Sequence, residues 1–165
     1  MLKTALLLLL FVSMTVDASG EEAPKDKDGP KPEPGPADSH EQEKPGPIDE
    51  DADGQFITTD SGLKYRMLRK SDNASPSASD SVEVHYKGWL DDGSIFDSSY
   101  RRASKISFPL SGVIKGWTEG LQLVGEGGMI ELEIPAELGY GARGAGGVIP
   151  PNATLHFVVE LFKIK

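Results

Sequence analysis

The side chains that could take part in chemistry here are aromatic residues and one carboxylate. Asp97 directly follows Phe96 at a turn, and the other candidates are Tyr86, Trp89, Phe108, Trp117, Tyr140 and Phe157. Burial habits alone leave open whether these rings belong to a functional site or to the hydrophobic core. The simpler interpretation is that the rings form the core and that Asp97 stabilises a turn.

The residue types argue against several classes of catalyst. The chain has no cysteine, which excludes thiol catalysis. Its three histidines, His40, His85 and His156, are too scattered to suggest a metal site, and no spacing supports a Ser-His-Asp arrangement. His85 and His156 occupy outward positions of expected strands, so we expect them to be exposed to solvent. The sequence therefore predicts neither a metal nor a cofactor.

Two short motifs match ligand-binding loops only in part. Residues 49–60 (DEDADGQFITTD) have the spacing of an EF-hand calcium loop, but no helix flanks them. We attribute the match to acidic composition, and calcium binding stays an open alternative. Residues 141–147 (GARGAGG) lack the Lys-Ser/Thr ending of a phosphate loop. Asn73 and Asn152 begin N-glycosylation sequons, whose use the sequence leaves open.

Alternating hydrophobicity predicts the strands that must position these residues. In residues 82–90 (VEVHYKGWL), two valines and Tyr86 alternate with Glu83, His85 and Lys87. Residues 129–135 (MIELEIP) alternate in the same way, and residues 154–165 are apolar on both faces, as in a central strand. We expect shorter strands over residues 63–68, 94–99 and 106–110.

A single helix is expected over residues 113–124, because Val113, Trp117, Leu121 and Val124 recur on one helical face. Several strands, one helix and long loops favour an α+β fold. One antiparallel sheet wrapped across the helix is the simplest way to bury both apolar faces.

Composition divides the chain into three segments. Residues 1–20 have the charged start, short apolar run and small residues of a signal peptide. Residues 21–54 hold seven of the twelve prolines and a net charge of −8, so we predict a disordered acidic linker that acts as a spacer. Residues 55–165 carry the remaining −1 of the chain's −9, because Lys3 and Asp17 cancel. With no basic stripe, no nucleic-acid partner is expected.

These features predict a secreted or periplasmic protein, with no membrane attachment after cleavage of the signal peptide. An uncleaved N-terminal membrane anchor is the alternative, and the ER lumen is another if the source is eukaryotic. The final residues, FKIK, do not match an ER retention signal.

Three stretches together resemble one known family. They resemble FKBP-type peptidyl-prolyl cis-trans isomerases in order and in spacing, and the stretches are VHYKGWLDDGSIFDSS, VIKGWTEGLQ and LGYGARGAGGVIPPNATLHFVVEL. The sequence around the second stretch is similar to the bacterial secreted branch of the family. The resemblance covers residues 55–165. It implies a half-open antiparallel sheet around one short helix, with an apolar pocket between them and the glycine-rich loop overhanging that pocket.

By position, the resemblance implies a catalytic set of Tyr86, Phe96, Asp97, Ile114, Trp117, Tyr140 and Phe157, and substrate contacts from Arg102, Ile106, Val113, Val148 and Ile149. Arg102 would support Asp97. Three departures from the family pattern bear on preference for substrates and for macrolide inhibitors. Ile106 stands where many members have an aromatic residue, and Gly112 stands where some have an acidic one. The loop tip is Ala145-Gly146, where others have bulkier residues.

The implied activity is isomerisation of X-Pro bonds in unfolded or partly folded exported polypeptides. Catalysis would be non-covalent, because an apolar pocket disfavours the polar planar amide relative to the twisted one. The alternative is a non-catalytic peptide-binding or chaperone module on the same fold.

Overall fold

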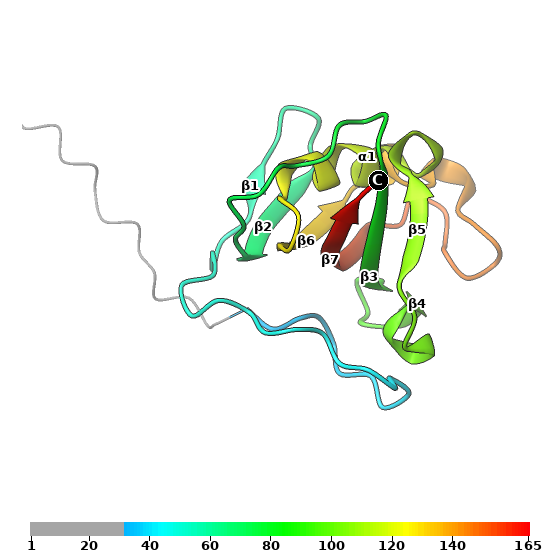
Figure 1. The fold of residues 1–165 in the computed structure, drawn as a ribbon. Helices are drawn as coiled ribbons and strands as arrows, with labels where there is room; N and C mark the ends of the chain where they lie inside the picture. The colour runs from blue at the N-terminus through cyan, green and yellow to red at the C-terminus, as the bar shows by residue number, and fades with distance from the viewer. Residues whose placement is uncertain (1–31) are drawn as a thin grey trace, which may run out of the picture.

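The computed structural model describes residues 32–165, so the predicted signal peptide, residues 1–20, and the start of the predicted linker, residues 21–31, lie outside the described residues. An antiparallel sheet of seven strands dominates residues 32–165 (Figure 1), made of β1 (Ile57–Thr58), β2 (Lys64–Arg69), β3 (Ser81–Trp89), β4 (Ile95–Ser98), β5 (Ile106–Pro109), β6 (Met129–Ile134) and β7 (Leu155–Ile164). The strand order is β1-β2-β6-β7-β3-β4, and β5 also pairs with β3. The predicted α+β fold is therefore confirmed.

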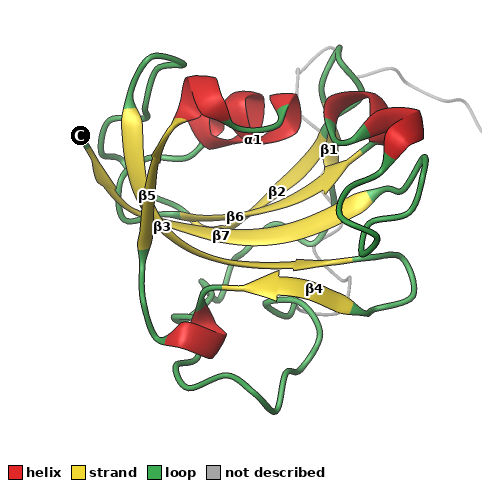
Figure 2. Cartoon of the chain, turned by 90° about the vertical axis from the view of Figure 1, so that its right-hand side faces the viewer, coloured by secondary structure: helices red, strands yellow, loops and turns green. Residues whose placement is uncertain are grey.

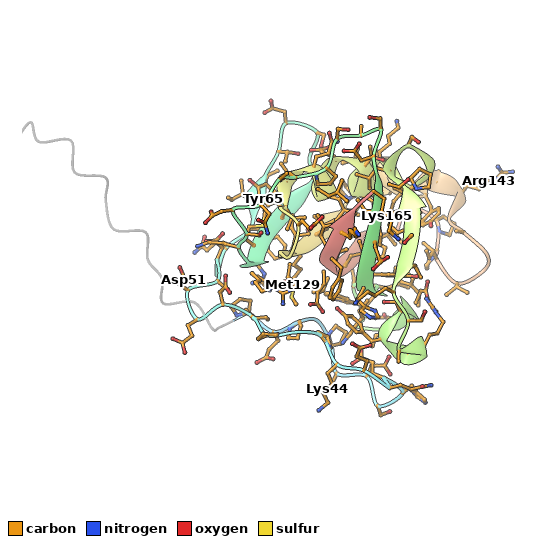
Figure 3. The ribbon with its side chains drawn as sticks, in the orientation of Figure 1. Lys44, Asp51, Tyr65, Met129, Arg143 and Lys165 are labelled. Atoms are coloured by element: carbon orange, nitrogen blue, oxygen red, sulfur yellow. The ribbon has the colours of Figure 1, made fainter. Side chains whose placement is uncertain are left out.

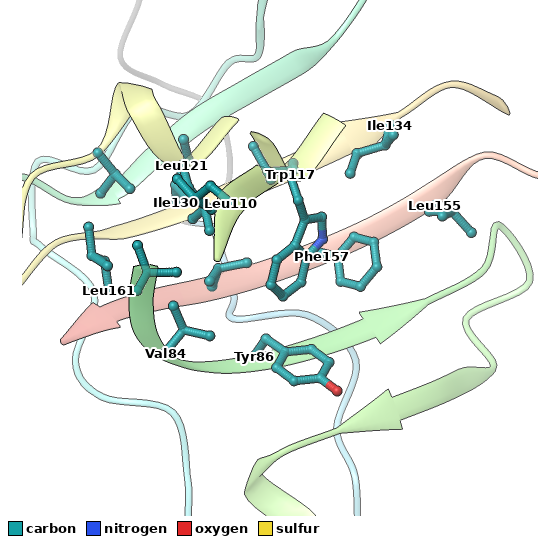
Figure 4. Close-up of a cluster of buried hydrophobic side chains, with 14 of the residues drawn as sticks. Val84, Tyr86, Leu110, Trp117, Leu121, Ile130, Ile134, Leu155, Phe157 and Leu161 are labelled. Carbon is teal, nitrogen blue, oxygen red and sulfur yellow. The ribbon is translucent and has the colours of Figure 1, made fainter. Parts of the chain in front are cut away.

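The sheet curves across the only α-helix of the described residues, α1 (Lys115–Gly120), which lies against its concave face (Figure 2). Val82, Val84 and Tyr86 of β3 point to this side and are at most 7% exposed. As predicted, β7 is a central strand, between β6 and β3. Its inward Phe157 and the rings of Tyr86 and Trp117 meet in the core (Figure 4). Each fully buried aliphatic side chain there contributes about 1.5–3 kcal/mol.

The helix is much shorter than the predicted 113–124. Val113 and Ile114 are extended, with φ/ψ of −113°/177° and −61°/149°, and α1 gives way to a 3₁₀ turn, η3 (Leu121–Leu123). Val113 and Ile114 are β-branched and favour extended backbone, while Gly116 and Gly120 are poor helix formers. These glycines have a packing role.

A Cβ at Gly116 would lie 2.5 Å from the side chain of Ile134, and one at Gly120 would lie 2.6 Å from the side chain of Leu132. The missing side chains let α1 approach β6 closely, at a cost in helix propensity. This close approach brings Trp117 down onto the sheet.

The predicted disordered linker is wrong for the residues that the structure describes. Residues 32–54, which we call the arm, lie along the outer face of the sheet, opposite α1 (Figure 1). The arm donates backbone hydrogen bonds from Gln42 to the carbonyl of Tyr100 and from Asp49 to the carbonyl of Leu68. Its Ile48 packs on a second small core of Leu68, Trp89, Met129 and Val158. Ion pairs and backbone hydrogen bonds thus dock a segment that has almost no apolar side chains.

The arm also corrects the predicted exposure of His85. This residue does point outward from β3, but it lies under the arm and is only 2% exposed. Its Nδ1 lies 2.8 Å from the Ser99 hydroxyl, and its ring stacks on Tyr100. His156, with 19% of its side chain exposed, is half-buried and stacks on Trp89.

The acidic residues 49–60 do not form a calcium-loop arrangement. The Asp49 carboxylate accepts a hydrogen bond from the Lys70 backbone N–H, and the Lys70 ammonium pairs with Asp51 and Asp53 at 3.5 and 3.8 Å. Residues 32–165 contain no group of three or more His, Cys, Asp or Glu side chains that could hold a metal ion. In the same range, no helix is long and apolar enough to cross a membrane.

Candidate active site

A cavity of about 670 Å³ opens between α1, the concave face of the sheet and the loop that follows β6. Fifteen residues line it: Tyr86, Phe96, Asp97, Ile106, Phe108, Gly112, Val113, Ile114, Trp117, Tyr140, Ala145, Gly146, Val148, Ile149 and Phe157. Most are aromatic or aliphatic, and one lining residue, Asp97, is charged at neutral pH. The cavity is suited to an apolar group with a few hydrogen-bonding atoms.

Trp117 forms the floor of the cavity and is 5% exposed. The rings of Phe157 and Tyr86 meet it edge to face, with centroids 5.1 and 5.2 Å away, and Phe108 is tilted against it at 5.3 Å. Edge-to-face pairs add about 0.5–1.5 kcal/mol beyond burial, so the floor is held rigidly. Figure 4 shows the Trp117 indole beside Phe157. Its N–H is buried and has no acceptor among the described residues.

The wall beside the floor depends on Gly88 of β3. A Cβ at this position would lie 2.5 Å from Cε1 of Phe157 and 2.6 Å from Cζ of Phe96. These two rings also contact each other edge to face, with centroids 5.5 Å apart. The absence of a side chain at Gly88 therefore lets the edges of both rings approach β3 closely while the rings line the cavity.

A cluster of three polar side chains lies at the rim. The Tyr86 hydroxyl donates a short hydrogen bond to Asp97, and Arg102 donates from Nη1 to the same carboxylate at 2.9 Å. The backbone N–H of Ser98 donates to it at 2.8 Å. Burial alone would raise the pKa of Asp97, but these hydrogen bonds and the guanidinium charge outweigh it and hold that pKa below its usual value.

The pKa values of the two side chains that donate to Asp97 are both raised, so both groups stay protonated. Burial, with the hydrogen bond to Asp97, raises the pKa of Tyr86 to about 12, and the hydrogen bond to Asp97 raises the pKa of Arg102. At neutral pH the rim therefore presents an ionised carboxylate between a phenol O–H and a guanidinium.

The glycine-rich loop after β6 overhangs the cavity, as predicted. Its Tyr140 and Val148 line the cavity and are 41% and 59% exposed. The loop closes on itself through hydrogen bonds between Ala145 and Ile149. Gly144 has φ of 63° beside the Ile149 carbonyl, a backbone position that a side chain would obstruct.

Eleven of the twelve predicted site residues line the cavity, and the twelfth, Arg102, contacts Asp97 and Tyr86 from outside it. The family-based set omitted four lining residues: Phe108, which had been named only among the aromatic candidates, and Gly112, Ala145 and Gly146, which had been named only as departures from the family pattern. Phe108 had a usable signal, because it is two residues from Ile106 on β5 and must share its face.

Besides the buried indole N–H of Trp117, one main-chain donor and one side-chain donor at the cavity remain available. The N–H of Ile114, at the start of α1, and the hydroxyl of Tyr140 make no hydrogen bond within residues 32–165. Both could donate to carbonyl groups of a bound peptide whose apolar side chain lies on Trp117. The geometry thus suits the recognition of an apolar residue within a polypeptide.

Comparison with known proteins agrees with this geometry. The sequence profile of the family described as FKBP-type peptidyl-prolyl cis-trans isomerase matches residues 72–162. The chain is 48% identical over 118 residues to the FKBP-type 22 kDa peptidyl-prolyl cis-trans isomerase of Escherichia coli, covering 71% of this chain and 57% of that protein. The chain spans about half the length of the curated relatives it matches.

Solved structures give the same result. The crystal structure of FkpA from Escherichia coli superimposes with a TM-score of 0.65 at 50% identity, covering 67% of this chain and 51% of FkpA. The peptidyl-prolyl cis-trans isomerase of Pseudomonas syringae pv. tomato matches with a TM-score of 0.63 at 37% identity, covering 67% of this chain and 80% of that one.

Proposed function

Because the chain belongs to the FKBP-type peptidyl-prolyl cis-trans isomerase family, we propose that it accelerates the cis-trans isomerisation of X-Pro bonds in polypeptides. The observation that carries the proposal is an apolar cavity, floored by Trp117, with the Asp97, Arg102 and Tyr86 cluster at its rim. The apolar floor suits the proline ring, and the polar edge suits the peptide groups beside that ring.

The reaction needs no covalent step. Rotation about an X-Pro amide has a barrier of about 20 kcal/mol, because resonance in the planar amide must be broken. The planar amide is strongly polarised and is stabilised by water, whereas the twisted amide has lost much of that polarisation. A dry aromatic cavity therefore disfavours the planar form relative to the twisted one, which lowers the barrier.

Each element of the site has a role in this proposal. The proline ring lies on Trp117, between Tyr86 and Phe157, with Phe96 at the side. The Ile114 N–H and the Tyr140 hydroxyl hold carbonyl oxygens of the peptide, which keeps the amide in place while it rotates. Asp97, held by Arg102, orients the polar groups near the twisted bond. Ile106, Val113, Val148 and Ile149 contact the neighbouring substrate residues.

We further propose that residues 1–20 are a signal peptide, that residues 55–165 are the isomerase domain and that the substrates are exported polypeptides during folding. The apolar run of residues 5–12 supports export, and the exposed Tyr140 and Val148 support contact with unfolded chains. Macrolide inhibitors of the family would occupy the same cavity.

The test is an isomerisation assay on short X-Pro peptides that vary X, followed by two-dimensional NMR exchange so that no coupling protease is needed. The expected result is exchange well above the uncatalysed rate, abolished by a macrolide inhibitor of the family. Binding of the peptides without faster exchange would instead support a non-catalytic peptide-binding or chaperone module.

A further inference from the structure

The rim of the cavity is carried by a weakly supported region of the sheet. Asp97 lies on β4, which has four residues and lies at the end of the strand order; among the strands of residues 32–165 it pairs with β3 alone. Arg102 lies on the next element, the 3₁₀ turn η1 (Tyr100–Arg102). Ser99, just before η1, exchanges hydrogen bonds with Tyr86 of β3. Short edge strands contribute few contacts, so further contacts to η1 add to its support.

The arm contacts η1 directly from the outer face. The backbone N–H groups of Gln42 and Glu43 both donate to the Tyr100 carbonyl, at 3.1 and 3.2 Å. The carboxylate of Asp38, only 2% exposed, pairs with Nε of Arg101 at 2.6 Å. Tyr100 and Arg101, the two residues before Arg102, are therefore both bonded to the arm.

A buried carboxylate joins the arm and η1 a second time. Glu160 of β7 is 3% exposed and accepts hydrogen bonds from the Tyr100 hydroxyl at 2.6 Å, from Arg69 at 2.9 Å and from the arm's Gly46 N–H at 2.9 Å. Charge-assisted hydrogen bonds of this kind are about twice as strong as neutral ones. The Glu160 carboxylate thus holds the hydroxyl of Tyr100, whose side chain is 1% exposed.

An ion pair closes the arm over β3. The Lys87 ammonium lies 2.9 Å from Oε1 of Glu41, in an ion pair that lacks hydrogen-bond alignment, and it donates to the Pro36 carbonyl at 2.9 Å. The two side chains are 3% and 7% exposed. Side chains fill the space between the arm and the sheet (Figure 3). Met129 of the sheet points toward the arm, whereas Lys44 of the arm points away from the sheet.

From these contacts we propose that the arm is a positioning element for the active site. It holds η1 from the outer face, and η1 in turn sets the place of Arg102 and so of the Asp97 carboxylate at the cavity rim. Glu41 and Asp38 are positioning residues, since neither touches the cavity. The inference rests on the proposed function only for its effect on turnover, because the coupling of arm and η1 is structural.

The experiment uses the full chain with three single substitutions in the arm. Glu41→Lys places an ammonium against Lys87 inside a buried contact, and Glu41→Gln removes the charge but keeps the shape. Glu50→Lys is the matched control, because it makes the same charge change at an exposed arm residue that forms no hydrogen bond or ion pair among residues 32–165. Hydrogen exchange and peptide turnover are measured on each.

The amides of Gln42, Glu43 and Gly46 report arm docking, and those of Arg102 and Ala103, bonded to Ser99 and Tyr100, report η1. In Glu41→Lys we expect both sets to lose protection and kcat/KM to fall about threefold to tenfold in fully folded protein. Glu41→Gln should lie between Glu41→Lys and wild type, and Glu50→Lys should match wild type.

Two results would overturn the proposal. In one, the arm amides lose protection while Arg102, Ala103 and kcat/KM stay at wild-type values. In the other, the arm of Glu41→Lys stays protected, so the ion pair does not hold it. If wild type itself shows no turnover, the proposed function fails, and the exchange at Arg102 and Ala103 still decides whether the arm positions η1.

Discussion

Replacement of Gly88 by alanine should damage the active site more than the fold. The added Cβ would lie 2.5 Å from the Phe157 ring and 2.6 and 2.8 Å from two atoms of the Phe96 ring. Carbon atoms in contact prefer a separation of about 3.5–4.0 Å, so each ring must retreat by about 1 Å. Both rings line the cavity, so the free direction for that movement is into the substrate site.

The magnitude follows from this direction of movement. Overpacking of a well-packed site costs about 1–3 kcal/mol, and space in the cavity should keep the loss of unfolding free energy in the lower half of that range. A displacement of about 1 Å at a substrate-contacting ring can cost up to about 100-fold in rate. We therefore expect kcat/KM for an X-Pro peptide to fall about 10- to 100-fold, or about 1.4–2.7 kcal/mol of transition-state stabilisation.

The assay is peptide exchange at a temperature where the variant is fully folded, with unfolding free energy measured separately by urea titration. Gly54→Ala is the control, because no atom of the described part of the chain lies within 4 Å of the added Cβ and the φ of Gly54 is not left-handed. It should match wild type in both measurements. If Gly88→Ala loses stability but keeps kcat/KM within twofold of wild type, Phe96 and Phe157 do not contact the substrate and the reasoning fails.

Three further outcomes are expected. Asp97→Asn should lower kcat/KM about tenfold with little loss of stability, because 44% of the side chain is exposed, and an equal loss of stability would show a turn role instead. In a Trp89→Phe background, a macrolide inhibitor should change Trp117 fluorescence saturably while it slows turnover, and Trp117→Ala should cost about 3–5 kcal/mol of stability; inhibition without a fluorescence change would move the site elsewhere. Burial lowers the pKa of His85 from 6.5, so on acidification the unfolded chain binds a proton at His85 at a higher pH than the folded protein does. The unfolding free energy should therefore decline as the pH falls below 6.5. His85→Gln should flatten this decline in urea titrations between pH 7 and 5, and an unchanged slope would contradict it.

Local patterns in the sequence were enough to predict most of the sheet, whereas the cavity was implied only by the family resemblance. Period-two alternation placed Tyr86 inward on β3, and the apolar run of β7 placed Phe157 on a central strand. Alternation is set by neighbouring residues, so it can be read without knowledge of the partner strands. The resemblance to a known family then placed eleven of twelve site residues on the cavity wall.

The sequence misjudged the features that depend on distant partners. The close approach of α1 to β6 at Gly116 and Gly120 is a contact that the apolar spacing of residues 113–124 does not reveal, and the helix is shorter than that spacing predicts. The two-residue strand β1 forms only because β2 offers it an edge.

What the sequence alone determined was therefore the inward face of each main strand and the apolar character of the site, because both follow from residue type and spacing. Only the tertiary structure decided the place of the arm. Proline and acidic residues predict disorder because they bury little apolar surface. Docking instead uses charges and backbone groups brought together from distant positions, such as the Gly46 N–H and the Glu160 carboxylate, 114 residues apart. The same docking buries His85 and Lys87, which any strand pattern would leave in solvent.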